Sequence, residues 1–339
     1  MSALLQESEN LTPQLPSAQL QRLPLVTLYL SERCNSRCVT CDYWRNGHED
    51  MSLEKVVQLM PALTRLQTEV VLISGGEPLL NPRWADIAGL LRAQGLKLWL
   101  LTSGLSLAKH AVRVSELFDA VTVSLDGTNR VTYEAIRGLD AFENVCAGIR
   151  AASRAGTPVS VRVTLQRANY TELPQFVQLA RQIGARSVSF LAVDVANLHA
   201  FARRDQPHVR TTALGADDLP LLDLLLQAME HDYVEEFRSG FIAESPAKLR
   251  RILQYFSAVC GSGDYPPVRC NAPEFSAVIR ANGQVNPCFF IPGPPAAAMH
   301  EDLDATLNRG GPTAQRVAIR SGQYPECKRC VCSAWRDPQ

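Results

Sequence analysis

The chain has 339 residues, 46% of them hydrophobic, and its 34 basic and 34 acidic side chains cancel to a formal net charge of zero. This composition is typical of a globular protein with one large and one smaller domain. The lack of a basic tract argues against nucleic acid as a partner, and no apolar run reaches the roughly 18 residues of a membrane span. Residues 1–24 show no basic region followed by an apolar core, which a secretory signal would need. We therefore expect a cytoplasmic protein with no membrane or nucleic-acid partner.

Short apolar or β-branched runs alternate with segments of helical period through the middle of the chain. The expected strands are residues 25–30, 70–74, 96–102, 120–125, 159–165 and 187–192, and the expected helices include 53–66, 84–93, 142–155 and 173–183. Strands that alternate with helices form parallel βα units. Such strands carry their functional loops at their carboxyl ends when they curve into a partial or full barrel. The sequence therefore predicts an α/β fold with its site at that edge.

Three cysteines, Cys34, Cys38 and Cys41, follow the first expected strand with the spacing C-x3-C-x2-C. Three thiolates on one loop can hold three corners of a cubane iron-sulfur cluster and leave the fourth iron without a protein ligand. Electron-transfer clusters usually have four thiolates, so this loop predicts that a substrate or cofactor completes the coordination. The spacing alone also fits a zinc site or a buried thiol cluster.

Further motifs follow later strands. Residues 74–78 read Ser-Gly-Gly-Glu-Pro after the second strand, where two glycines permit a tight turn. Residues 124–127 read Ser-Leu-Asp-Gly after the fourth strand, and Arg137 and Gly138 come next. With the cysteine triplet, these motifs resemble the signature of the radical S-adenosylmethionine (SAM) superfamily.

The resemblance implies both a chemistry and a fold. In that superfamily the amino and carboxylate groups of SAM chelate the open iron of a 4Fe-4S cluster. One electron, from a low-potential donor such as flavodoxin or ferredoxin, then cleaves the sulfonium to give a 5'-deoxyadenosyl radical. We accordingly expect an N-terminal extension over residues 1–23, a partial (β/α)6 barrel over 24–210, linking helices over 211–259 and a small cysteine-rich domain over 260–339.

The same resemblance implies SAM-binding residues near the cluster loop. Gly75, Gly76 and Glu77 match the motif whose exposed backbone groups bind the SAM ammonium. Tyr43 matches an aromatic position whose backbone contacts adenine, although its ring also suits simple packing beside Trp44.

Four polar residues on the fourth and fifth βα units are further candidates. By the resemblance, Ser124 would hydrogen-bond the ribose or carboxylate of SAM and Arg137 would pair with the carboxylate. Asp126 is either a ligand or a turn-forming residue. Arg162 would serve a carboxylate if it points into the barrel, because an unpaired buried charge is unfavourable, and would be a surface residue if it points outward.

A second set of cysteines lies near the C-terminus, comprising Cys270, Cys288, Cys327 and Cys330. Four convergent thiolates fit a tetrahedral zinc ion or a closed cubane, and spacing does not choose between them. The pattern resembles the auxiliary-cluster module of radical SAM enzymes, called twitch in its short form and SPASM in its fuller form. Its layout resembles that of the dehydrogenase of butirosin biosynthesis. The resemblance implies one auxiliary 4Fe-4S cluster, with Cys260 and Cys332 left over.

The substrate is harder to predict. In sulfatase-maturing relatives a catalytic aspartate follows the second of these cysteines, whereas Phe289 follows Cys288 here. Peptide-modifying relatives often carry a winged-helix domain before the barrel, where this chain has a short leader. We therefore expect an oxidoreductase or isomerase that dehydrogenates or epimerises a small polar metabolite such as an aminocyclitol or sugar. The alternatives are modification of a precursor peptide and a non-catalytic iron-sulfur or zinc protein.

Three residues are candidates for contact with that substrate. Cys260 precedes a flexible Gly-Ser-Gly segment and is the candidate hydrogen-atom donor of an epimerase, since an S–H bond is weak. His199 and His208 follow the sixth strand and are candidates for the barrel mouth.

Overall fold

The computed structural model describes residues 19–197, 200–202, 207–294 and 302–337. Its centre is an eight-stranded sheet with the order β6-β5-β4-β3-β2-β1-β7-β8. The strands are β1 (Leu25–Ser31), β2 (Val70–Gly75), β3 (Lys97–Thr102), β4 (Ala120–Ser124), β5 (Val159–Leu165), β6 (Ser187–Ala192), β7 (Ser276–Ile279) and β8 (Val285–Asn286). Neighbours from β6 through β7 pair in parallel and β8 pairs antiparallel with β7. The sheet is therefore the predicted series of βα units extended by a short hairpin.

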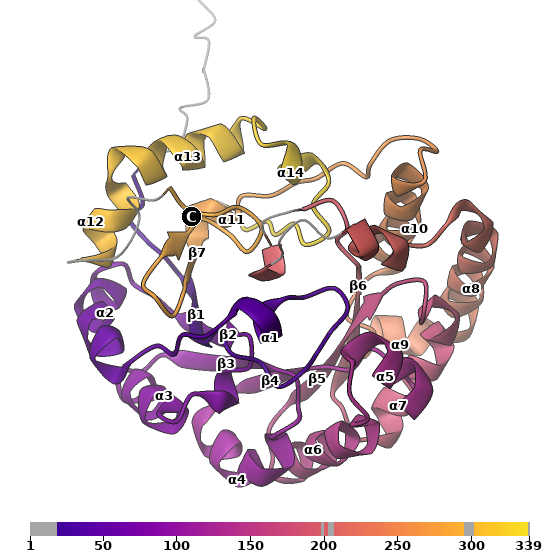
Figure 1. The fold of residues 1–339 in the computed structure, drawn as a ribbon, viewed down its shortest axis with the longest axis horizontal. Coiled ribbons are helices and arrows are strands. Elements are labelled where there is room, and N and C mark those ends of the chain that lie inside the picture. The colour runs from indigo at the N-terminus through magenta and orange to yellow at the C-terminus, as the bar shows by residue number, and fades with distance from the viewer. Residues whose placement is uncertain (1–18, 198–199, 203–206, 295–301, 338–339) are drawn as a thin grey trace, which may run out of the picture.

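Helices cover the outer face of the curved sheet (Figure 1). They are α2 (Leu53–Arg65), α3 (Trp84–Ala93), α4 (Leu107–Leu117), α5 (Arg130–Arg137), α6 (Phe142–Arg154) and α7 (Leu173–Gln182). Their apolar stripes and the strand side chains that face them form one large core. Caps fix several boundaries: Ser52 accepts a hydrogen bond from the Lys55 amide before α2, and Asn129 accepts one from Thr132 before α5. The prediction of a partial barrel of parallel βα units is confirmed.

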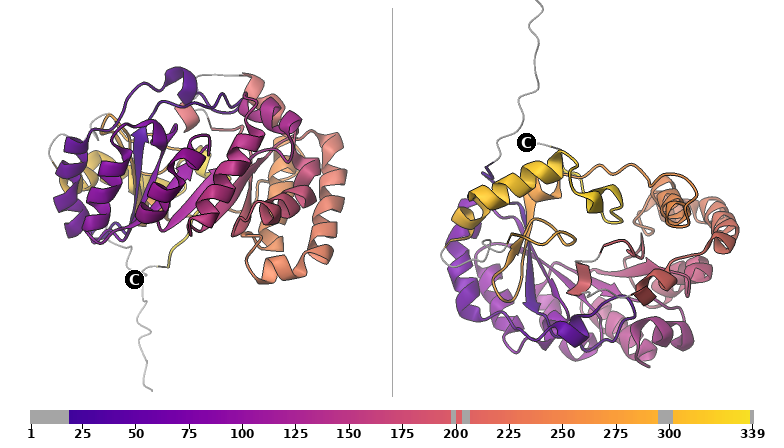
Figure 2. Two further views of the ribbon diagram at one scale, coloured as in Figure 1. Left: turned by 90° about the horizontal axis from the view of Figure 1, so that it is seen from below. Right: turned by 45° about the horizontal axis from the view of Figure 1, so that its top comes forward.

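Beyond β6 the chain forms α8 (Leu219–Asp232), α9 (Val234–Arg238) and α10 (Pro246–Val259). The C-terminal part then adds α11 (Ala272–Phe275), the β7–β8 hairpin, α12 (Leu303–Asn308), α13 (Gly310–Arg320) and α14 (Pro325–Lys328). In Figure 1 the yellow segment from α12 to α14 runs from the side of α2 toward α10, and Figure 2 shows it beside the orange β7–β8 hairpin. The C-terminal segment thus connects the two ends of the curved sheet.

The sequence did not predict β7 and β8, which make the C-terminal segment continuous with the barrel sheet. The domain boundaries stay a prediction, and residues 1–18 of the expected N-terminal extension lie outside the described residues. No helix in the described ranges is long and apolar enough to cross a bilayer.

Candidate active site

The loop with Cys34, Cys38 and Cys41 follows β1 and is held from the side by α5, whose C-terminal end meets it. The Arg37 amide donates to the Arg137 carbonyl at 2.9 Å, and the Val39 amide donates to the Ile136 carbonyl at 3.0 Å. Gly138 caps α5 with φ 70°, and a Cβ there would stand 2.4 Å from the Arg37 carbonyl oxygen. Only glycine permits this close approach. The Arg-Gly motif therefore positions the cysteine loop through its backbone.

The thiols of this loop lie close enough for Cys38 to influence the pKa of both Cys34 and Cys41. The pKa of the Cys34 thiol is raised to about 11 and that of Cys41 to about 12, mainly by burial and with a contribution from Cys38. The pKa of Cys38 is also raised by burial, while Arg137 opposes that shift. All ten cysteines are free thiols, and no three His, Cys, Asp or Glu side chains of the described ranges are grouped for a metal ion.

The donor set of this loop is suited to an iron-sulfur cluster. It consists of sulfur alone, which is the ligand type that iron-sulfur clusters use. Backbone groups of Ser36 and Tyr43 lower the pKa of the Cys34 and Cys41 thiols, respectively, against the effect of burial. Amide donors of this kind support thiolates when a metal replaces their protons.

The two glycines at the end of β2 lie against the start of the cysteine loop. Gly75 has φ 131°, and a Cβ added to it would meet the Ser31 carbonyl oxygen at 2.2 Å. The corresponding distance from Gly76 to the Arg33 carbonyl oxygen is 2.4 Å. The Gly76 amide donates to Ser31 at 2.7 Å. These two positions require glycine because the backbone of one loop packs directly on the other.

Glu77 ties the ends of β2 and β3 together. Its carboxylate is fully buried and accepts hydrogen bonds from the Thr102 hydroxyl at 2.8 Å, the Ser103 amide at 2.7 Å and the Ser103 hydroxyl at 2.6 Å. The Leu79 amide donates to it as well, at 3.1 Å. The side chain is occupied by protein donors, so these contacts support a positioning role for Glu77. Its predicted contact with SAM stays a prediction.

Arg137 and Asp126 form an ion pair beside the cysteine loop. Arg137 Nη1 lies 3.1 Å from Asp126 Oδ2, and the side chains are 11% and 4% exposed. Asp126 Oδ1 also accepts from the Thr164 amide of β5 at 2.7 Å. Burial lowers the pKa of Arg137, but Cys38 and Asp126 raise it, and the net shift is upward. Asp126 therefore fixes a permanently charged guanidinium in place.

This guanidinium still has a donor to offer. Arg137 Nε is buried and has no hydrogen-bond partner. An unsatisfied buried donor is unfavourable unless a ligand completes it. Its position beside Cys38 matches the carboxylate contact that the resemblance implies for Arg137.

The remaining SAM candidates occupy different surroundings. The Tyr43 ring is 7% exposed and packs edge-on against Tyr29, with centroids 5.9 Å apart. Ser124 ends β4 half-buried and pairs in register with Arg162 of β5. Arg162 is half-buried, and its Nε is buried without a hydrogen-bond partner. The expectation that Arg162 points into the barrel agrees with this placement.

The second cysteine set comes from three separate places in the chain, namely Cys270, Cys288 and the segment from Cys327 to Cys330. Burial raises the pKa of the Cys288 and Cys327 thiols to about 11, and in both Cys270 adds to the shift. The pKa of Cys330 is raised by burial and by its neighbours Cys332, Cys270 and Cys288. The Cys332 amide donates to the Cys330 sulfur at 3.4 Å. The four predicted ligands thus lie close enough to influence one another.

A backbone clamp that sequence reasoning missed brings the two halves of this set together. Asn271 follows Cys270; its amide donates to the Ala334 carbonyl at 3.0 Å and its side-chain nitrogen donates to the Arg336 carbonyl at 2.7 Å. The Arg336 amide returns a hydrogen bond to Asn271 Oδ1 at 2.9 Å. An asparagine next to a cysteine was the only signal of it in the sequence.

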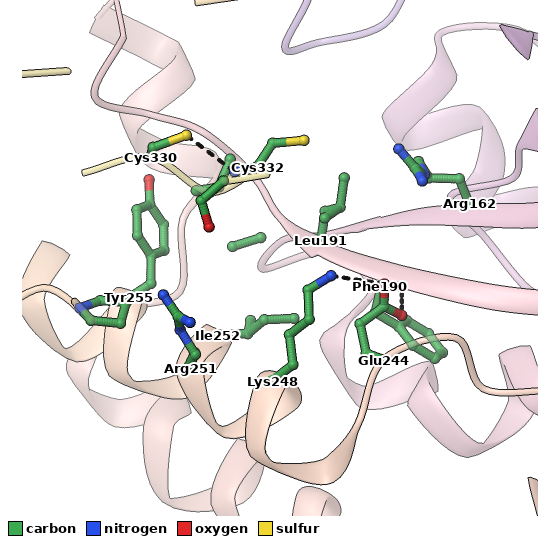
Figure 3. Close-up of a pocket in the computed structure, with 14 residues that line it drawn as sticks. Arg162, Phe190, Leu191, Glu244, Lys248, Arg251, Ile252, Tyr255, Cys330 and Cys332 are labelled. Atoms are coloured by element: carbon green, nitrogen blue, oxygen red, sulfur yellow. Dashed lines mark hydrogen bonds and ion pairs between the residues drawn. The ribbon is translucent and has the colours of Figure 1, made fainter. Parts of the chain in front are cut away.

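The leftover thiols differ in their surroundings. Cys332 lines a cavity of about 130 Å³ between β5, β6, α10 and the segment 330–333 (Figure 3). Cys260, at the end of α10, instead donates to the Leu214 carbonyl at 3.3 Å and is not among the residues that line this cavity. Its predicted role as hydrogen donor stays a prediction. His199 and the side chain of His208 lie outside what the structure describes.

Residues 28–180 match the sequence model of the radical SAM superfamily. The chain carries a radical SAM domain. Enzymes with this domain use a 4Fe-4S cluster together with SAM. The matched segment begins in β1, before the cysteine loop, and ends in α7.

Relatives of the radical SAM domain have several different activities. The chain is 32% identical over 168 residues to the pre-heme d1 synthase of Dinoroseobacter shibae. This alignment covers 48% of this chain and 41% of the synthase. It is 28% identical to the AdoMet-dependent heme synthase of Methanosarcina barkeri, with 48% of each covered. It is 26% identical to a probable GTP 3',8-cyclase of Saccharolobus solfataricus, and this alignment covers 77% of this chain and 81% of the cyclase. The chain spans about half the length of the first two relatives.

Two solved radical SAM structures have the same fold. Streptococcus suis SuiB bound to its precursor peptide SuiA is 13% identical, covers 88% of this chain and 67% of that one, and has a TM-score of 0.62. The protein anSMEcpe with bound AdoMet and a peptide is 16% identical to this chain, with a TM-score of 0.63. The superposition covers 86% of this chain and 82% of anSMEcpe. At this level of identity the likeness concerns the fold alone.

Proposed function

We propose that this radical SAM enzyme acts on a small polar metabolite and carries one auxiliary 4Fe-4S cluster at Cys270, Cys288, Cys327 and Cys330. The observation that carries the proposal is the cavity beside this second cysteine set. Its volume of about 130 Å³ is below the roughly 300–1,000 Å³ of pockets that take drug-sized ligands. Such a space suits a compact metabolite, or one end of it, better than an extended peptide.

At the first site, a bound cluster and SAM would supply the radical that abstracts a hydrogen atom from the substrate. Cys34, Cys38 and Cys41 would hold the cluster. Arg137, held by Asp126, would pair with the SAM carboxylate through its free Nε donor, since guanidinium groups recognise carboxylates well.

The other SAM contacts of the proposal come from strand ends. The backbone of Gly75 and Gly76 would face the SAM ammonium, and Glu77 would hold that loop in shape. The backbone of Tyr43 would contact adenine, and Ser124 would contact the ribose or carboxylate. These positions surround the cysteine loop from β2, α1 (Tyr43–Asn46) and β4.

The second site completes the proposed electron path. A closed cubane with four thiolates exchanges electrons without binding substrate, which is what a dehydrogenase needs after hydrogen abstraction. The electron that starts the reaction would come from a low-potential donor such as flavodoxin or ferredoxin. The cytoplasmic location stays a prediction.

Modification of a precursor peptide is the second candidate. It is favoured by the fold shared with SuiB, which was solved with its precursor peptide. The relatives found by sequence, however, are named for heme synthesis and GTP cyclisation. Those names support a small-molecule substrate.

The two candidates predict different sources of the abstracted hydrogen. Reconstituted enzyme, SAM and dithionite would be incubated with the small-molecule fraction or the peptide fraction of a deuterated cell extract. We expect deuterium in 5'-deoxyadenosine with the small-molecule fraction. Transfer from the peptide fraction alone would reject the metabolite proposal in favour of peptide modification.

A further inference from the structure

The cavity beside the second cysteine set has more positive than negative side chains. Arg162, Lys248 and Arg251 line it, together with one carboxylate, Glu244, among the described residues (Figure 3). The cations come from two elements that face each other across the space, β5 and α10. Such a lining would repel a cationic ligand and attract an anionic one.

Glu244 does not neutralise the two arginines, because its oxygens already have partners. The Ser189 hydroxyl donates to Oε1 at 2.9 Å, and the Phe190 amide donates to Oε2 at 2.8 Å. Lys248 Nζ lies 3.7 Å from Oε1. The carboxylate is buried, with 5% of its side chain exposed. Its role is to hold Lys248 at the cavity and to fix α10 to β6.

Within the described part of the chain, neither arginine forms an ion pair with a carboxylate. Arg162 Nε is buried without a hydrogen-bond partner, and Figure 3 shows its guanidinium directed from β5 toward Cys332. Arg251 donates to the Pro267 carbonyl, a neutral acceptor. A guanidinium in a partly desolvated position is stabilised strongly by an anion that it can grip with two parallel hydrogen bonds.

We propose that this cavity binds an anionic group of the substrate, a carboxylate or a phosphate, between Arg162, Lys248 and Arg251. The proposal deepens the proposed function, on which it rests for the identity of the cavity as the substrate site. It assigns Arg162 to the substrate, while Arg137 serves the SAM carboxylate. The volume of about 130 Å³ accommodates one oxyanion and a short stretch of the molecule that carries it.

The competing explanation is that these cations offset the charge of the second cysteine set. Cys332 lies close enough to Arg162 and Lys248 for both to lower its pKa against the effect of burial. If the cations served the cluster, their removal would release iron and leave anion binding unchanged. The two explanations therefore predict different results when the cations are removed. A role toward the cluster predicts a lower iron content, and a role toward the substrate predicts a lower affinity for anions.

The test is the binding of inorganic phosphate and of acetate to the reconstituted holoenzyme by titration calorimetry, with iron measured in every sample. The variants are Arg162→Gln and Arg251→Gln. The control is Arg113→Gln, an exposed arginine on α4 that pairs with Glu116. The loss of one charged hydrogen-bonding group is expected to weaken anion binding at least about tenfold.

We expect both variants to bind the anion more weakly, with full iron, and the control to bind it as the wild type does. Tighter binding of inorganic phosphate would indicate a phosphate ester in the substrate, and tighter binding of acetate would indicate a carboxylate. Wild-type protein that binds neither anion, equal binding by all variants, or iron loss as the main effect would each overturn the proposal. Failure of the proposed function is separate, because it would appear as deuterium transfer to 5'-deoxyadenosine from the peptide fraction alone, whatever the affinity of the cavity for anions.

Discussion

Arg137 and Asp126 form a buried ion pair between α5 and the loop after β4, with Nη1 and Oδ2 at 3.1 Å. The Thr164 amide of β5 donates to the other oxygen of the same carboxylate at 2.7 Å. Asp126 thereby joins three elements around one guanidinium that keeps an unpaired donor. In the proposed function, the pair would link the stability of the barrel to the recognition of SAM.

Replacement of Asp126 by asparagine is predicted to lower the free energy of unfolding by about 3 kcal/mol, because it leaves the buried Arg137 charge without its partner. Denaturant unfolding of the metal-free protein measures this change. The matched control is Asp140→Asn, which breaks the exposed pair of Asp140 with Arg130 at 2.7 Å. Exposed pairs contribute about 0–1 kcal/mol. Equal losses in the two variants would contradict the assigned role of Asp126.

Replacement of Gly138 by alanine is predicted to reduce loading of the first cluster. The new Cβ would meet the Arg37 carbonyl oxygen at 2.4 Å, which pushes the cysteine loop away from α5. Gly95→Ala is the matched control, because Gly95 also has a positive φ, 80°, with nothing within 4 Å of an added Cβ. Both variants carry backbone strain of about 1–2 kcal/mol. Iron analysis after reconstitution should show a deficit in Gly138→Ala alone.

Anaerobic protein is predicted to hold about eight irons per chain, the content of two cubanes. Replacement of Cys270 and Cys288 by alanine should remove about four of them. Replacement of Cys332, whose thiol lies at the cavity, should remove none. About four irons together with stoichiometric zinc in the wild type would instead identify the second set as a zinc site.

The donor role of Cys260 has a direct test in Cys260→Ala, assayed with the substrate once it is identified. A donor role predicts loss of product while 5'-deoxyadenosine still forms. The Cys260 thiol donates to the Leu214 carbonyl, and Cys260 is not among the residues that line the cavity. Unchanged product and turnover would eliminate the role and favour dehydrogenation or peptide modification over epimerisation.

The sequence predicted the barrel well because its signals are local. Strands β5 and β6 coincide with the predicted ranges 159–165 and 187–192, since both are apolar runs with clear turns at each end. The motifs around Cys34, Gly75 and Asp126 directly follow strands, so their meeting at one edge followed from the parallel topology.

The rest depends on contacts between distant segments. Strand β7 is four residues long within a cysteine-rich region, too short to show a period. The pairing of Glu77 with Ser103, and the approach of Lys248 to the space beside Arg162, join elements that no spacing relates. The same holds for the clamp between Asn271 and Arg336, which only the folded chain reveals.

The formation of 5'-deoxyadenosine from SAM tests the central claim most directly. Anaerobically reconstituted protein with dithionite is predicted to produce it, because Cys34, Cys38 and Cys41 leave one iron open for SAM. The variant in which all three are replaced by alanine is predicted to produce none, while it keeps the about four irons of the second set. Production of 5'-deoxyadenosine by that triple variant at the wild-type rate would contradict the account.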